Sequence, residues 1–165
     1  MRTRIKRKTD IADAIKYYGE DILCEVKFRN SDKNTQHGKT SVMDHSISVA
    51  YVSVKLAQFS HLRYDFSALV RGALLHDYFC YDCHDHENPH HSIRHADTAC
   101  KNAAETFSIS PIEANMIQRH MFPLNLKPPR YREAIILCIA DKLCATSEIF
   151  HKTIYDETIE KRIKK

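Results

Sequence analysis

The sequence has 165 residues, enough for one compact domain with a full hydrophobic core, and its three glycines are too few for a phosphate-binding loop of the P-loop or dinucleotide-fold type. Its formal charge is +4, but residues 1–8 hold five basic groups and residues 161–165 hold four, which leaves 16 basic against 21 acidic residues in the body. This net-negative body disfavours nucleic acid as a partner, and we expect the basic ends to be solvated.

Helical periodicity predicts an N-terminal helix over residues 9–27, with an irregular apolar face. Residues 29–40 are polar and predict a loop. The next helix is expected over about 41–59, because Ser41 and Asp44 have the spacing of a capping box before a run of apolar residues.

A third helix is expected after Asp65, ending in an apolar run just before His76 and Asp77. Residues 79–93 interrupt the helical pattern with Asn88-Pro89 and several histidines, which predicts an irregular loop. The next helix is expected from His95 to about Phe107.

The segment Ser110-Pro111-Ile112-Glu113 is the clearest helix start in the chain, with a capping serine, a proline at the first position and a glutamate able to reach back. This helix is expected to end near His120, and three prolines then predict an extended connection. A long, strongly apolar helix over about 131–149 is expected to lie in the core. No alternating stretch predicts a sheet, so the fold class is all-α.

Two carboxylates directly follow apolar runs of the expected helices, where burial would make an uncompensated charge costly. Asp141 follows the apolar stretch from Ala134 to Ala140, and Asp77 closes the apolar helix beside His76. An unpaired charge in such a place costs several kcal/mol. A salt bridge from Lys142 or an arginine is one remedy, and a bound cation is the other.

Six candidate metal ligands stand at or near the ends or inside the expected helices: His45, His76, Asp77, His95, His120 and Asp141. Their order, together with the segments His45–Ala50, Gly72–Asp77 and Ala140–Lys142, resembles the HD superfamily of metal-dependent phosphohydrolases. The resemblance covers roughly residues 36–150. It implies an all-helical HD bundle whose ligands project from several helices into one cleft.

The resemblance also implies two divalent metal ions. One ion would be held by His45, His76, Asp77 and Asp141, and the other by Asp77, His95 and His120, with Asp77 as the bridge. Imidazole and carboxylate ligands suit iron, manganese, nickel, cobalt or zinc, and the sequence does not choose among them.

The implied reaction is hydrolysis of a phosphate ester or anhydride, of a nucleotide or related small metabolite, by a hydroxide that bridges the metals. Lys142 and Arg119, each beside a ligand, are candidates for binding phosphate oxygens, with ordinary ion pairing as the alternative. Nucleotidase members place an acid three positions after the HD aspartate, where this sequence has Cys80. Asp82 is therefore the candidate proton donor, with loop solvation or helix capping as the alternative.

Several other interpretations remain open. The segment Cys80-Tyr81-Asp82-Cys83-His84 has the spacing of c-type haem attachment, and its cysteines and histidines could instead hold a structural zinc. The resemblance itself leaves room for a di-iron oxygenase or for a catalytically silent, metal-dependent ligand-binding module. The Gly-Tyr-Pro motif of cyclic-dinucleotide phosphodiesterases does not follow the histidines, which disfavours that subclass.

The six cysteines are expected to be reduced thiols, because three of them lie in apolar helical patterns and no secretion signal or membrane-spanning window is present. We therefore expect a soluble cytoplasmic protein. The expected organisation is one HD-type domain over residues 1–165, with an N-terminal helix and loop (1–35), an HD core (36–150) and a basic C-terminal tail (151–165). A homodimer through the N-terminal helix is compatible with the sequence.

Overall fold

The structure, a computed structural model, describes residues 10–37, 39–78, 91–150 and 157–164. It is mostly helical and confirms the all-α fold class. Within the described residues the elements are α1 (Ile11–Leu23), α2 (Val26–Asn30), η1 (Ser31–Lys33), β1 (Thr35–His37), β2 (Thr40–Ser41), α3 (Val42–Ser60), α4 (Phe66–Leu75), α5 (His91–Thr106), α6 (Pro111–Arg119), α7 (Arg132–Ile149) and α8 (Glu157–Lys164).

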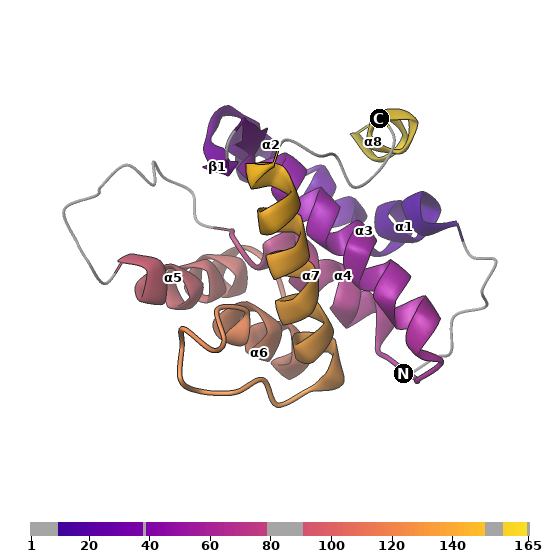
Figure 1. Ribbon diagram of the computed structural model, residues 1–165. Coiled ribbons are helices and arrows are strands. Elements are labelled where there is room, and N and C mark those ends of the chain that lie inside the picture. Colours follow the sequence, from indigo (N-terminus) through magenta and orange to yellow (C-terminus); the bar gives the residue numbers. More distant parts are fainter. Residues whose placement is uncertain (1–9, 38, 79–90, 151–156, 165) are drawn as a thin grey trace.

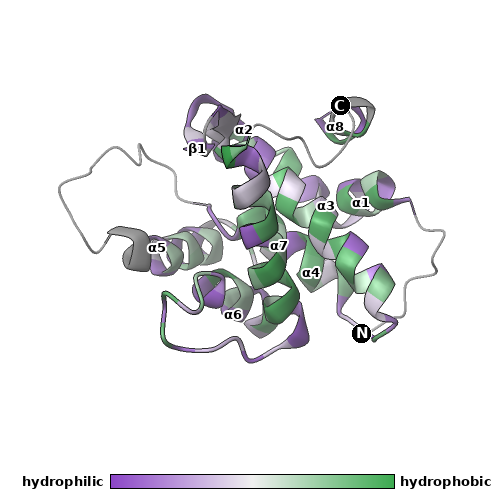
Figure 2. Cartoon of the chain, viewed as in Figure 1, coloured by the Kyte–Doolittle hydropathy of each residue, from purple (hydrophilic) through white to green (hydrophobic). Residues whose placement is uncertain are grey.

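The centre of the fold is α4, which packs against α1, α3, α6 and α7. Nearly all of its side chains are buried, including Leu69, Leu74 and Leu75. The long helix α7 crosses in front of α3 and α4 (Figure 1). Figure 2 shows hydrophobic residues along α4 and along much of α7.

The prediction that residues 131–149 form a core helix is correct for one face only. The face of α7 toward α3 and α6 is buried, whereas Ile135, Ile139 and Leu143 on the other face are about half exposed. The helix is apolar on both faces, so its sequence resembles that of a fully buried helix.

The close approach of α4 and α6 depends on Gly72. A Cβ atom at this position would lie 2.6 Å from Met116 Sδ and 2.7 Å from Met116 Cε. Met116 is completely buried, so its side chain has no solvent-filled space to move into. His76 and His120 are the residues that directly follow α4 and α6, and Gly72 therefore brings these two histidines near each other.

The N-terminal region differs from its prediction in two ways. The helix expected over 9–27 ends at Leu23, because Glu25 has extended backbone angles and its carboxylate caps α2 by accepting from Phe28 N–H. The loop expected over 29–40 contains η1 and an antiparallel β1–β2 hairpin with an irregular register. This hairpin leads directly into α3, whose first turn is capped by Ser41.

The later helices follow the predictions more closely. Both hydrogen bonds of the Ser110–Glu113 capping box are present at the start of α6. Helix α5 begins at His91, four residues before the predicted start, so the predicted loop over 79–93 is wrong at its end. The remainder of that loop, residues 79–90, lies outside the described residues, as do Cys80, Asp82, Cys83 and His84 with the haem and zinc interpretations.

The basic residues at the C-terminal end were expected to be solvated, and Lys161 and Arg162 are exposed. The helical structure of residues 157–164 was not expected. They form α8, which packs on α1 and buries Ile163 to 2% exposure. Arg162 donates hydrogen bonds to Asp10 at 3.1 Å and to Asp13 at 2.9 Å. Lys164 forms an ion pair with Asp44.

Two simpler expectations concern thiols and membranes. The four cysteines among the described residues, Cys24, Cys100, Cys138 and Cys144, are free thiols. In the described parts of the chain, no helix combines the length and the apolar character needed to cross a bilayer.

Candidate metal centre

The fold brings the six predicted ligands together from five helices. His45 lies in the first turn of α3, His76 and Asp77 at the end of α4, His95 on α5, His120 at the end of α6 and Asp141 in α7. They form two adjoining groups, each with its ligand atoms within 4.8 Å of one another: His45, His76 and Asp141 in the first, and Asp77, His95 and His120 in the second.

The first group converges on the carboxylate of Asp141. His45 Nε2 lies 3.2 Å from Asp141 Oδ1, and His76 Nε2 lies 3.7 Å from the same oxygen. Both imidazoles are completely buried. Two ring nitrogens and one carboxylate oxygen thus point at a common position inside the protein.

The second group converges on the carboxylate of Asp77. His95 Nε2 and His120 Nε2 are 3.0 Å apart and lie 3.6 Å and 3.5 Å from Asp77 Oδ1. The other oxygen, Asp77 Oδ2, lies 3.3 Å from His76 Nε2 and 4.0 Å from His45 Nε2. One oxygen of Asp77 therefore faces each group.

Hydrogen bonds to backbone carbonyl groups orient the imidazoles of His76 and His120. Nδ1 of His76 lies 2.8 Å from the carbonyl oxygen of Ala73, and Nδ1 of His120 lies 2.7 Å from that of Ile117. Both nitrogens must donate, because a carbonyl only accepts. Nε2 of each ring is then left to act as an electron-pair donor toward the centre, the usual arrangement for a metal-binding histidine.

The pKa shifts show a centre with ionised carboxylates. Burial alone would raise the pKa of Asp77 and Asp141, but the neighbouring imidazoles hold both pKa values well below their usual range. Burial lowers the pKa of His120 to about 4. For His45 the effect of burial is outweighed by hydrogen bonds with Asp141 and Glu148, which raise its pKa to about 9.

These residues fit a bound cation. His76 Nε2 and Asp77 Oδ1 are buried atoms with no hydrogen-bond partner among the described residues. Leaving such atoms unsatisfied costs about 1–3 kcal/mol each. A cation in the first group would satisfy His76 Nε2, and a cation in the second group would satisfy Asp77 Oδ1. Imidazole nitrogens with carboxylate oxygens are donors suited to first-row transition metals and zinc.

The predicted basic residues lie close to the centre in sequence, with differing contacts. Lys142 Nζ donates to the carbonyl oxygens of His120 at 3.1 Å and Cys138 at 3.3 Å, so its ammonium group supports the backbone behind a candidate ligand. Arg119, the last residue of α6, is partly exposed beside His120. Their predicted phosphate-binding roles, and that of Asp82 as proton donor, stay predictions.

Two residues beside the centre were not anticipated. Gln36 Nε2 donates to Asp77 Oδ2 at 2.6 Å, and His45 Nδ1 lies 2.8 Å from Glu148 Oε2. Glu148 had a signal in the sequence, because it lies two helical turns after Asp141 and so on the same side of the helix. Gln36 had none, since it comes from a segment that was expected to be a loop.

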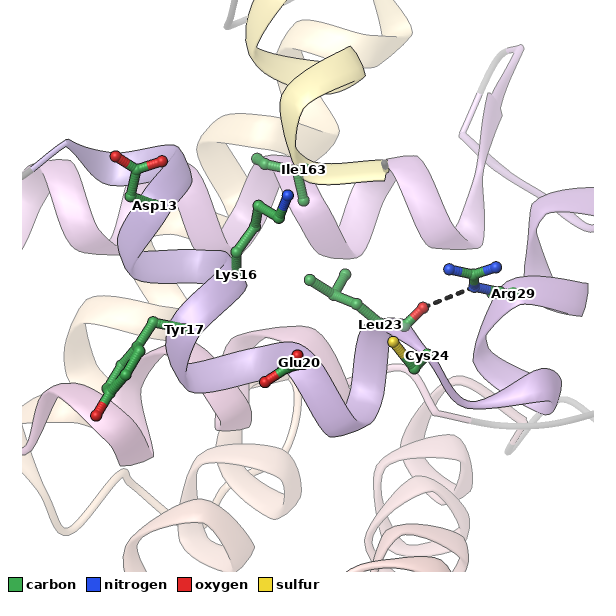
Figure 3. Close-up of a pocket in the computed structure, with 8 residues that line it drawn as sticks. All are labelled: Asp13, Lys16, Tyr17, Glu20, Leu23, Cys24, Arg29 and Ile163. Carbon is green, nitrogen blue, oxygen red and sulfur yellow. Dashed lines mark hydrogen bonds between the residues drawn. The ribbon is translucent and has the colours of Figure 1, made fainter.

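A separate pocket is lined by elements that contribute no residue to the two groups of candidate ligands. It has a volume of about 460 Å³, and Figure 3 shows residues from α1, the α1–α2 junction, α2 and α8 around it. The lining residues are Asp13, Lys16, Tyr17, Glu20, Leu23, Cys24, Arg29 and Ile163, none of which belongs to either ligand group.

The sequence matches the HD domain family over residues 42–146, which is more than half of the chain. The protein therefore belongs to the HD domain family. Members of this family are mostly phosphohydrolases, and the matched region contains all six candidate ligands. No curated protein and no solved structure shows a significant match to this chain.

Proposed function

We propose that this protein is a phosphohydrolase that uses two divalent metal ions to cleave a phosphate ester or anhydride of a nucleotide-like small metabolite. The observation that carries the proposal is the position of Asp77, whose two carboxylate oxygens each face one of two histidine-containing groups. Membership of a family consisting mostly of phosphohydrolases supports the reaction class.

In this proposal His45, His76 and Asp141 hold one ion, and His95 and His120 hold the other. Asp77 bridges them. When bound, the ions polarise phosphoryl oxygens and lower the pKa of water. The chain's own part is to orient the donor atoms and to exclude water. The Nδ1–carbonyl hydrogen bonds of His76 and His120 fix the orientation of the rings, and the burial of both rings excludes water.

The substrate is proposed to be anionic, in agreement with the charge of two divalent ions. We assign the binding of phosphate oxygens to Arg119, which is partly exposed and adjacent to His120 in the sequence. Lys142 already donates to two backbone carbonyl groups, and we assign it to support of His120. Asp82 remains the proposed proton donor. We also propose a cytoplasmic location, in keeping with the free thiols.

The test is a metal analysis of the purified protein followed by a screen for phosphate release from mononucleotides, dinucleotides and sugar phosphates. Replacing Asp77 with alanine should abolish both metal retention and turnover. Asp97→Ala is the matched control, because Asp97 is an exposed carboxylate on α5 outside both ligand groups. Full activity of the Asp77→Ala variant would refute the site assignment.

The same preparation separates the alternatives. The imidazole-rich donor set suits a di-iron centre as well as a hydrolytic one. A mixed-valent iron signal in electron paramagnetic resonance, together with no phosphate release, would favour the oxygenase. Stoichiometric metal binding without turnover of any compound would favour the silent ligand-binding module.

A further inference from the structure

His45 differs from the other oriented histidines in the partner of its Nδ1 atom. This atom lies 2.8 Å from the carboxylate oxygen Oε2 of Glu148, whereas His76 and His120 each donate to a neutral backbone carbonyl. A carboxylate acceptor draws the Nδ1 proton more strongly than a carbonyl does, and so makes Nε2 a stronger electron-pair donor. His45 should therefore be the strongest imidazole ligand of the centre.

The carboxylate of Glu148 is buried and only partly compensated by its neighbours. The residue is 6% exposed, and its second oxygen, Oε1, has no hydrogen-bond partner among the described residues. Among the described residues, its one ion-pair partner is His45. A buried carboxylate with so little compensation is destabilising unless the positive charge beside it is large.

Among the described residues, the two ligand groups are consequently unequal in the negative charge beside them. Beside the first group lie the carboxylates of Asp141 and Glu148, together with Asp77 Oδ2. Beside the second lies Asp77 Oδ1. A divalent cation is favoured where more negative charge surrounds it.

The two groups are also unequal in burial. His45 and His76 are completely buried, whereas the side chain of His95 is 12% exposed. Water and competing ligands reach a partly exposed ligand more easily, which favours exchange of the ion that it holds.

We propose that Glu148 is a positioning residue that makes the two metal positions unequal. The position formed by His45, His76 and Asp141 binds its ion tightly and fills first, and the position formed by Asp77, His95 and His120 holds the exchangeable ion. This inference rests on the metal ligation proposed above, but not on the reaction or the substrate.

The experiment is a titration of the apo-protein with Co²⁺ in competition with a chromophoric chelator, with the absorption spectrum recorded after each equivalent. The wild type should bind two ions in two resolved steps. Glu148→Gln should weaken the first step by about 10–100-fold and shift the spectrum of the first ion, while the second step changes little. His120→Ala should remove the second step and leave the first.

Glu133→Gln is the matched control. Glu133 is also a buried glutamate of α7, but it accepts a hydrogen bond from Asp65 N–H at the start of α4. This variant should lower stability without changing either binding step. Glu148→Asp, which keeps the charge, should recover part of the first step and guards against misfolding of Glu148→Gln.

Three outcomes would overturn the inference without affecting the proposed function. These are two indistinguishable steps in the wild type, equal weakening of both steps in Glu148→Gln, or an unchanged first step in that variant. Absence of any Co²⁺ binding would overturn it together with the proposed function. Two-step binding weakened as described, in a protein that releases no phosphate, would support the inference and count against the hydrolase alone.

Discussion

Replacing Gly72 with alanine tests how the α4–α6 contact positions the residues of the candidate metal centre. The added Cβ would lie 2.6 Å from Met116 Sδ and 3.2 Å from Met116 Cβ, inside a fully packed core. Overpacking of this kind costs about 1–3 kcal/mol. Alanine gains about 1 kcal/mol in helix propensity over glycine, so we expect a net loss of about 0–2 kcal/mol.

For a protein of this size, a loss of 1 kcal/mol lowers Tm by about 2–4 °C. Differential scanning calorimetry of the metal-free protein should therefore show a decrease of Tm of up to roughly 8 °C. The ring centroids of His76 and His120 are 5.0 Å apart, and displacement of α6 should also weaken metal binding by these residues.

A double-mutant cycle with Met116→Ala separates overlap from other effects. Met116→Ala alone should cost about 2–5 kcal/mol, because it leaves a cavity. In the double variant the alanine side chain occupies part of that cavity, so the combined loss should be smaller than the sum by about 1 kcal/mol or more. Increased stability of Gly72→Ala, or strict additivity in the cycle, would refute the reasoning.

Three further predictions concern the metal, a helix cap and pH. Metal added at a hundredfold excess over Kd should raise the free energy of unfolding by about 2.7 kcal/mol per filled position, and a Tm unaffected by metal would contradict the site. Ser110→Ala removes one hydrogen bond of the α6 capping box and should cost about 1 kcal/mol in urea denaturation, against no loss if the cap is unimportant. The pKa of His45 is raised from 6.5 to about 9 in the folded apo-protein. Protonation of His45 therefore stabilises the apo-protein fully below pH 6.5, and this stabilisation is lost as the pH rises through about 9. A metal ion must displace that proton, so the affinity for metal should rise over this pH range. Calorimetry in two buffers would measure the proton release, and an affinity independent of pH would contradict the raised pKa of His45.

The sequence predicted what depends on helical period and on local capping. The helices beginning near Ser41 and Ser110 have serines that cap their first turns, and these cap interactions are formed within each segment. The grouping of the six ligands was anticipated through the order of the motif. Their distances were not, because these depend on how separate helices pack.

Two of the errors have a physical origin in contacts between distant segments. Helix α8 is stabilised by its packing on α1 and by ion pairs with residues near the start of the chain, such as Arg162 with Asp10. Gln36 contacts Asp77 from 41 residues away. The local sequence of the basic C-terminal segment, or of the loop expected over residues 29–40, contains no information about such partners.

The sharing of Asp77 between the two groups has a consequence for local unfolding. Ions held by these ligands would connect α3, α4, α5, α6 and α7, and any opening that separates one of these helices from Asp77 or its partners would also break a metal–ligand bond. Amide hydrogen exchange in those five helices should then slow together when metal is added. Helices α1 and α8 supply no ligand, so their exchange should remain governed by their own packing and ion pairs.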